Sequence, residues 1–399
     1  METVVGLEIH VELHTESKMF CSCGTRFGLP PNSQCCPICM GLPGTLPTVN
    51  ARAVVWGALA GIALHSKVQL ASRFDRKQYF YPDMPKGYQI TQRDHPLCQG
   101  GFLTLPETGK RIEIEEMHLE EDSGKITHRE DKSYVDLNRC GVPLLEIVTR
   151  PVLSSGNEAY QFLNLLRDTL TQLGVTTGRM QEGALRVDVN VSVREKDAAL
   201  GPRTEMKNLS SFKAVRAAID HEAKRQIALI SQGEPIRRET RRWDERGGFS
   251  TSLRSKETAP DYRYFPEPDL PWIQVTEDHL EEMQRNLPEL PEQIQLRLMQ
   301  IAGITYDKAV QLSNQPGLLR CFDSAYAMAP ADAKKILNWL LGDYKAIAKK
   351  NGLSPDSPPF SPEAFALLMK QVVLEALPFK EARASLEAMC GIDNSNSAL

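Results

Sequence analysis

The chain has 399 residues, of which 41% are hydrophobic and 25% are charged, and its formal net charge is −4. This composition is typical of a folded protein and excludes the disordered and collagenous classes. A chain of this length exceeds what one hydrophobic core usually supports, so we expect two or three domains. The nearly balanced charge provides no global positive field for nucleic acid, which leaves any phosphate contacts to a local basic patch or to a partner protein.

No part of the sequence predicts a membrane span, because no window of about 18 consecutive apolar residues occurs. The chain enters a predicted strand directly after Met1, so we expect neither a signal peptide nor a transit peptide and predict a cytoplasmic protein. Nine cysteines are an odd number in such a chain, which argues against a disulfide framework.

The first clear pattern is "VGLEIHVEL" at residues 5–13. Apolar residues alternate there with Glu8, His10 and Glu12, which predicts a strand with one buried face and one polar face. Two carboxylates and an imidazole in succession are an unusual polar face for a strand. The segment "ALRVDVNVSVRE" at residues 184–195 repeats the alternation, and its polar face carries Arg186, Asp188, Asn190, Ser192 and Arg194.

The segment "RIEIEEMHLEEDSGK" at residues 111–125 predicts a strand with a β-bulge. The apolar parity set by Ile112 and Ile114 shifts near Glu115 and Glu116, and bulges often re-aim side chains at active sites. Beyond the shift, the strand presents His118, Glu120 and Asp122 on one side and Met117, Leu119 and Glu121 on the other.

These strands predict a site for a divalent cation. Glu146 lies inside the apolar run "VPLLEIVT", where an unpaired carboxylate would cost several kcal/mol, so we expect a cation or a positive side chain beside it. Residues two apart on a strand are about 6.6 Å apart, so carboxylates of neighbouring strands can meet at one ion. Glu, Asp, Asn and a single His suit Mg²⁺ or Mn²⁺ better than zinc. The acidic run at residues 113–122 also fits an ordinary solvated strand and turn.

A second metal site is predicted by the cysteine-rich segment at residues 21–39. Cys21 and Cys23 are separated by twelve residues from Cys36 and Cys39, and two closely spaced pairs of this kind fit tetrahedral Zn²⁺. Cys35 would be the spare thiol. No open position or nearby general base is evident, so we expect a structural zinc. The alternative is a loop with free cysteines.

Basic and aromatic residues are mixed in "RFDRKQYFYPDMPKGYQIT" at residues 73–91, which includes Lys77 and Lys86. This segment fits either a surface loop with solvated charges or a phosphate-binding element beside the metal. The sequence has no P-loop, no Rossmann fingerprint and no Gly-x-Ser-x-Gly motif. If the protein uses ATP, we therefore expect it to do so with a metal on a sheet.

The expected fold class is α+β, with an antiparallel sheet followed by an all-helical domain. Residues 1–287 predict short strands and two helices, one from about Asn157 to Gly174 and one from a cap at Ser210 or Ser211 to Gly233. From about Pro288 the pattern is helical, with breaks at glycine and proline residues, so we expect a second domain at residues 288–399.

Several segments occur together in an order that carries a family resemblance. They include "VGLEIHVEL", "CSCGTRFGLPPNSQCCPIC", "FDRKQYFYPDMPKGYQITQ", "HLEEDSGK", "VDLNRCGVPLLEIVTRP", "EGALRVDVNVSV", "TEMKNLSSF", "ETRRWDE" and "DYRYFPEPDLP". From residue 1 to about 270 the chain resembles the family of the B subunit of the glutamyl- and aspartyl-tRNA amidotransferase, and the helical part resembles that family's second domain more loosely. The resemblance implies a catalytic cradle domain similar in fold to glutamine synthetase.

The function that this resemblance implies is correction of misacylated tRNA. With ATP and Mg²⁺, the protein would phosphorylate the side-chain carboxylate of Glu on tRNA(Gln) or of Asp on tRNA(Asn). Ammonia from a separate amidase A subunit would then displace the phosphate, and a small C subunit would complete a heterotrimer. The family usually continues into a C-terminal helical tail, which we expect to be absent here.

The resemblance also implies residue roles. The metal and phosphate site would use Glu8, His10, Glu120, Glu121, Glu146, Asp188 and Asn190, with Arg186 nearby and Glu8, His10, Glu121, Glu146 and Asp188 as the catalytic group. Lys77 and Lys86 match positions near the path of ammonia. Cys21, Cys23, Cys36 and Cys39 match the cysteine-bearing branch of the family, which favours a structural zinc.

Two other functions fit parts of the pattern. The acidic face could dock a partner without catalysis, or it could serve a metal-dependent nuclease. The preference for Glu-tRNA or Asp-tRNA is left open by the sequence.

Overall fold

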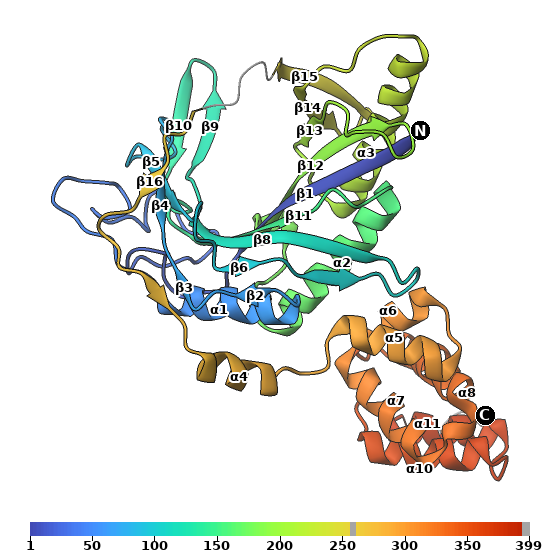
Figure 1. Cartoon of the computed structure of the whole chain (residues 1–399). Coiled ribbons are helices and arrows are strands. Elements are labelled where there is room, and N and C mark those ends of the chain that lie inside the picture. The colour runs from blue at the N-terminus through green and yellow to red at the C-terminus, as the bar shows by residue number, and fades with distance from the viewer. Residues whose placement is uncertain (256–260, 393–399) are drawn as a thin grey trace. The chain divides into compact units, whose positions relative to one another are not determined.

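The structure is a computed structural model that describes residues 1–255 and 261–392. It divides into two compact units, Met1–Pro288 and Glu289–Leu399 (Figure 1). The sequence-based boundary lies between residues 287 and 288. No helix among the described residues is both long enough and apolar enough to cross a membrane.

The first unit is built on one large sheet. Its strand order is β15 (Phe249–Ser255), β14 (Glu239–Asp244), β13 (Thr204–Lys207), β12 (Leu185–Arg194), β1 (Glu2–Glu12), β11 (Pro143–Thr149), β8 (Arg111–Glu121), β6 (Cys98–Gln99) and β2 (Lys67–Val68), with β7 (Phe102–Thr104) beside β8. Neighbouring strands are antiparallel except β13 and β14, which run parallel. The α+β prediction is confirmed, whereas the sheet is mixed and not purely antiparallel.

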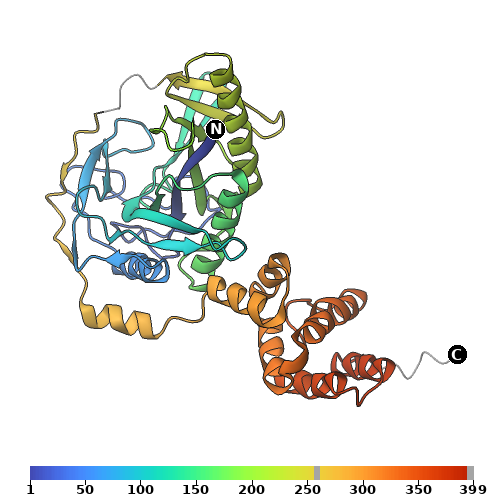
Figure 2. The ribbon, with the colours of Figure 1, turned by 45° about the vertical axis from the view of Figure 1, so that its right-hand side comes forward.

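Smaller sheets accompany the large one. They are β16 (Phe265–Pro266) with β4 (Asp75–Gln78) and β5 (Tyr88–Thr91), the hairpin β9 (Lys125–Arg129) with β10 (Lys132–Asp136), and β17 (Ile273–Gln274) with β3 (Ala71–Ser72). Figures 1 and 2 show the sheet of β4, β5 and β16 on one side of the large sheet, with the helices α2 (Gly156–Gln172) and α3 (Phe212–Ser231) on the other.

The alternation predicted for β1 and β12 is present and places the core. Leu7, Ile9 and Val11 of β1 are almost fully buried and pack in one hydrophobic cluster with Val187 and Val189 of β12. The helices α2 and α3 add their apolar stripes to the same cluster, and their N-termini are capped by the hydroxyls of Ser155 and Ser211. The opposite, polar face of the large sheet is therefore left for function.

The helix α1 (Ala51–Ala63) was not predicted from the sequence. Its residues are apolar on nearly all sides, so no stripe with helical period stands out. Small residues allow a close approach, because a Cβ at Gly57 would lie 2.6 Å from a methyl carbon of Leu97. The short amphipathic helix α4 (Glu277–Arg285), which follows the cap Thr276, was also missed.

The second unit is all-helical in its described part. It contains α5 (Pro291–Ala302), α6 (Tyr306–Ser313), α7 (Pro316–Met328), η2 (Pro330–Asp332), α8 (Ala333–Asn338), the π-helical turn η3 (Trp339–Tyr344), α9 (Lys345–Lys350), α10 (Pro362–Val373) and α11 (Phe379–Met389). Phe322, Phe365 and Tyr344 lie in its separate core, and the Tyr344 hydroxyl donates to the carbonyl of Ser354 at 2.8 Å. Helices begin or end near the predicted proline and glycine breaks.

Candidate functional site

The register of four adjacent strands, β12, β1, β11 and β8, brings the predicted polar groups together. His10 of β1 lies opposite Glu146 of β11 and opposite Arg186 of β12, and Glu146 in turn lies opposite His118 of β8. Directly opposite residues point to the same face of a sheet. The sequence predicted each polar face separately, and the strand order makes them one surface.

The first group on this surface consists of His10, Glu120 and Glu146, whose ligand atoms lie within 4.8 Å of one another. The Nε2 atom of His10 lies 3.3 Å from Oε2 of Glu146 and 3.6 Å from Oε1 of Glu120. The Nε2 atom of His118 lies 3.4 Å from the same oxygen of Glu146. We call these four residues the imidazole cluster. Glu146 thus has the positive partners that its apolar surroundings led us to expect.

Burial and charge shift the titration of the imidazole cluster in opposite directions. Burial lowers the pKa of His10, but the hydrogen bond and charge of Glu146 together with the charge of Glu120 outweigh it and raise the pKa to about 9. Burial also lowers the pKa of His118, but the charge of Glu146 and the hydrogen bonds with Glu116 and Glu146 outweigh it and raise the pKa to about 10. The two imidazoles hold the pKa of Glu146 well below its usual range despite its burial.

A second group lies further along the same sheet face, where Glu8 precedes His10 by two residues on β1. Glu8, Asp188 and Glu205 offer ligand oxygens within 4.8 Å of one another, and we call them the carboxylate cluster. The side-chain amide of Asn190 donates to Oε1 of Glu8 at 2.9 Å. The ammonium of Lys207 lies 2.5 Å from Asp188 and 3.2 Å from Glu205. Burial, followed by the charge of Glu146, raises the pKa of Glu8.

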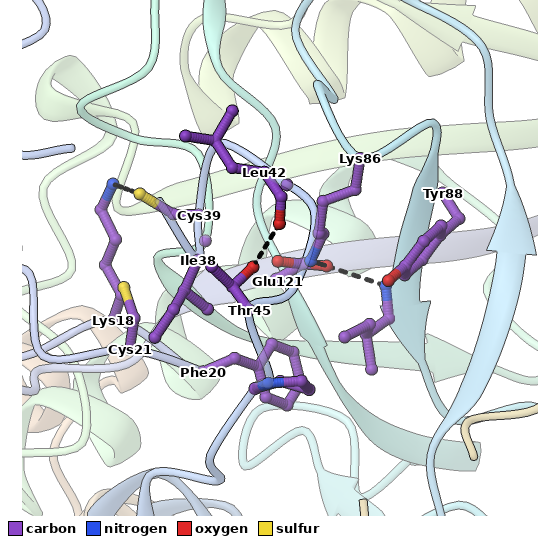
Figure 3. Close-up of a pocket in the computed structure, with 14 residues that line it drawn as sticks. Lys18, Phe20, Cys21, Ile38, Cys39, Leu42, Thr45, Lys86, Tyr88 and Glu121 are labelled. Carbon is purple, nitrogen blue, oxygen red and sulfur yellow. Dashed lines mark hydrogen bonds and ion pairs between the residues drawn. The ribbon is translucent and has the colours of Figure 1, made fainter. Parts of the chain in front are cut away.

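The bulge in β8 is confirmed, and Glu121, further along the strand, lies outside both clusters. The pairing with β11 shifts so that Val148 faces Glu116 and Thr149 faces Ile114. Glu121 then pairs through its carboxylate with the Lys86 ammonium and accepts from the backbone N–H of Ile90 at 2.9 Å (Figure 3). The strand parity had placed Glu121 on the side opposite Glu120. Its assignment to the metal site came from the resemblance, and the structure does not bring it into either cluster.

Two of the predicted basic residues, Lys77 and Arg186, lie near the imidazole cluster. Lys77 of β4 lies near Glu120 and Glu146, whose charges raise its pKa against the lowering effect of burial. Arg186 donates from Nη1 to Asp122 at 2.7 Å, and it also lies near Glu12 and Glu120. Both cations therefore border the polar face.

The four predicted zinc ligands also converge. The Sγ atoms of Cys21, Cys23, Cys36 and Cys39 lie within 4.8 Å of one another, and Cys35 is outside the group. The fully buried Lys18 contacts Cys39 Sγ at 3.7 Å. A hydrogen bond from Cys21, the backbone N–H of Cys36 and the charge of Lys18 together lower the pKa of the Cys39 thiol to about 4 despite burial. This set of soft donors fits a tetrahedral zinc.

A cavity of about 570 Å³ borders the carboxylate cluster. Glu8 and Asn190 line it together with apolar residues, among them Leu7, Val148 and Leu200. Arg203 and Arg238 also line it. An apolar wall next to carboxylates and guanidinium groups can take a ligand that is part aromatic and part phosphate.

The sequence analysis did not assign Glu205 or Lys207 to the site. Both lie on β13 within "TEMK", a four-residue strand whose Met206 is buried. The alternation was too short to identify the strand, although it does put Glu205 and Lys207 on one face. Glu12 was seen on the polar face but given no role, and burial followed by the charge of Asp122 raises its pKa to about 7.

The oxygen and imidazole donors gathered at two points on this sheet face are of the kind that fits Mg²⁺. Residues 3–281 match a family model described as the GatB/GatE catalytic domain. The chain belongs to the GatB/GatE family.

Curated relatives cover most of the chain. The B subunit of the aspartyl/glutamyl-tRNA(Asn/Gln) amidotransferase from Caldicellulosiruptor saccharolyticus is 48% identical over 360 residues, which are 89% of this chain and 75% of the relative. The protein of the same name from Thermoanaerobacter pseudethanolicus is 44% identical over 395 residues, which are 98% of this chain and 83% of the relative. The protein of that name from Ruminiclostridium cellulolyticum is 45% identical over 390 residues, which are 96% of this chain and 80% of the relative.

Proposed function

We propose that the protein is the B subunit of an aspartyl/glutamyl-tRNA amidotransferase, and that it phosphorylates the side-chain carboxylate of a misacylated tRNA before amidation. Support comes from the names of the relatives and, in the structure, from the meeting of the imidazole and carboxylate clusters on one sheet face. The meeting of these clusters is the observation that carries the proposal. The similarity to the fold of glutamine synthetase stays a prediction.

In the proposed reaction, a carboxylate oxygen of the aminoacyl group attacks the γ-phosphorus of ATP and ADP leaves with the electron pair of the broken P–O bond. The nitrogen of ammonia then attacks the carbonyl carbon of the acyl phosphate. Inorganic phosphate leaves with the electrons of the C–O bond, and the nitrogen loses one proton to form the amide. Such transfers depend chiefly on positioning and on charge neutralisation.

The chain's own residues fit these tasks. Mg²⁺ would be held by the oxygen and imidazole donors Glu8, His10, Glu120, Glu146, Asp188 and Asn190, to which we add Glu205. The bound ion would neutralise phosphate charge. Lys77 and Arg186 border the face from which a phosphate would be reached, and the cavity next to Glu8 has room for the nucleoside of ATP. Zn²⁺ would be held by Cys21, Cys23, Cys36 and Cys39 as a structural ion.

Ammonia would come from a partner amidase A subunit, with a small C subunit in a heterotrimer, and Lys86 is assigned to the ammonia route. We expect this assembly in the cytoplasm, where it would meet misacylated tRNA(Gln) and tRNA(Asn).

The test measures ADP release by the complex in the presence and absence of misacylated tRNA. We expect release that depends on the misacylated tRNA and that falls at least about 100-fold in His10→Ala. His14→Ala, which changes an exposed residue just beyond β1, is the matched control and should behave as wild type. Equal turnover in His10→Ala and His14→Ala would contradict the site. RNA cleavage would favour a nuclease, and no nucleotide-dependent metal binding would favour a docking face.

A further inference from the structure

One cavity of the first unit has the cysteine loop as part of its wall. It has a volume of about 90 Å³, and its lining includes Cys21 and Cys39 from the loop as well as Lys86 and Glu121 (Figure 3). The cysteines and the ion pair of Lys86 and Glu121 are therefore neighbours in space, although they lie in separate segments of the sequence.

A close approach between the two features occurs at Gly41, two residues after Cys39. Gly41 has a φ of +67°, a left-handed conformation that favours glycine. A Cβ at this position would lie 2.7 Å from Cγ and 2.8 Å from Cα of Lys86. Because the second contact is with the backbone, a side chain at Gly41 requires the backbone of Gly41 or of Lys86 to move.

The ion pair that depends on Lys86 is almost fully enclosed. The side chains of Lys86 and Glu121 are 8% and 2% exposed. The Lys86 ammonium also lies 5.7 Å from the ring centre of Phe20 and 5.5 Å from that of Tyr88. A buried charge that loses its partner is strongly unfavourable, so the pair tolerates little displacement of Lys86.

Backbone hydrogen bonds hold the loop where it carries Cys36 and Cys39. The backbone N–H of Met40 donates to the carbonyl of Cys36 at 3.0 Å, and that of Gly41 donates to the carbonyl of Ile38 at 3.0 Å. These bonds form a tight turn around Cys36 and Cys39. The position of Gly41 is thereby set by the same turn that presents the two thiols.

We propose that the cysteine loop is a positioning element, in which Gly41 holds Lys86 against Glu121 and so supports amide formation without taking part in phosphorylation. The link to amide formation rests on the proposed function, because it uses the assignment of Lys86 to the ammonia route. The positioning of Lys86 by Gly41 rests on the contacts alone.

The test compares Gly41→Ala with Gly44→Ala in the full chain, purified with its partner subunits. Gly44 also has a left-handed conformation, with a φ of +84°, but a Cβ there would meet nothing within 4 Å. Acylation of Lys86 by an amine-reactive reagent is followed by mass spectrometry, and the ADP and the amide formed are measured in parallel. We expect Gly41→Ala to label faster at Lys86 and to form on the order of tenfold less amide per ADP, whereas Gly44→Ala matches wild type.

Equal labelling of Lys86 in the two glycine variants would overturn the positioning role. A labelling difference with an unchanged ratio of amide to ADP would overturn the link to amide formation. If wild type releases no ADP in response to misacylated tRNA, the proposed function fails, and the labelling contrast still decides the positioning role. Should Gly41→Ala not fold, Cys39→Ser loosens the same turn without added volume. Faster labelling of Lys86 in Cys39→Ser than in Cys35→Ser supports the positioning role, and equal labelling of Lys86 in these two variants overturns it.

Discussion

His10 and Glu146 lie directly opposite each other on β1 and β11, with Nε2 of His10 3.3 Å from Oε2 of Glu146. On its other side the same oxygen lies 3.4 Å from Nε2 of His118 on β8. One oxygen of a partly buried carboxylate thus connects imidazoles from two strands. Because strand pairing fixes the three backbones, the geometry of the candidate metal site follows from the sheet itself.

The contact between His118 and Glu146 predicts a positioning role for His118. His118→Gln removes one of the two imidazoles at Glu146 while leaving His10 and Glu120 in place. We expect the affinity for Mn²⁺ in the presence of ATP to fall about 10- to 100-fold, measured by electron paramagnetic resonance. His128→Gln, on the hairpin of β9 and β10, is the control. An affinity equal to that of wild type would show that His118 does not orient Glu146.

The raised pKa values of His10 and His118 predict a loss of stability at high pH. Both exceed the usual value of 6.5, so the folded protein binds these protons more tightly than the unfolded chain. The contribution is fully present below about pH 6.5 and is lost as the pH rises through about 9 and 10. Urea unfolding without divalent metal should give a free energy of unfolding at least about 1 kcal/mol lower at pH 10 than at pH 7. A flat profile over this range would contradict the pairing.

Glu12 predicts an effect at lower pH. Its folded-state pKa of about 7 lies above the usual 4.5, so its contribution to stability is present below about pH 4.5 and is lost as the pH rises through 7. Glu12→Gln removes the ionised carboxylate beside Asp122 and should raise the free energy of unfolding by about 1 kcal/mol at pH 8, with little change at pH 4.5. The exposed Glu16→Gln is the control. A gain that is equal at both pH values would rule out this explanation.

The cysteine group predicts a zinc content that depends on four of the nine thiols. Cys21→Ser should lower the bound zinc measured by mass spectrometry from about one ion per chain to near zero, and it should lower the melting temperature. Cys35→Ser should retain the zinc, because Cys35 lies outside the group. Zinc loss in both variants, or zinc in neither wild type nor variant, would contradict the assignment.

The sequence predicted the faces of the strands more completely than their arrangement. Alternation identified β1 and β12, and the parity shift in β8 located the bulge and the opposite orientations of Glu120 and Glu121. Strand order and register could not be read, because they depend on pairing between segments far apart in the chain. Glu121 was assigned to the metal site from the family resemblance and against its strand parity, whereas in the structure it pairs with Lys86.

Short or uniformly apolar elements account for most of what was missed. The strand β13 offers only four residues of alternation, so the roles of Glu205 and Lys207 appear only when β13 pairs with β12. The helix α1 lacks a polar face and gives no periodic signal. The cysteine spacing was informative because four thiols in two close pairs limit the possible geometry.

Transfer of oxygen from the aminoacyl carboxylate to phosphate is the sharpest test of the proposed phosphorylation. The complex is supplied with ATP, an ammonia source and misacylated tRNA whose side-chain carboxylate carries ¹⁸O. We expect each amide formed to be accompanied by one inorganic phosphate with a single ¹⁸O from that carboxylate, and we expect His10→Ala to form neither product. Amide formation with unlabelled phosphate would show that the carboxylate is not phosphorylated and would contradict the proposed function.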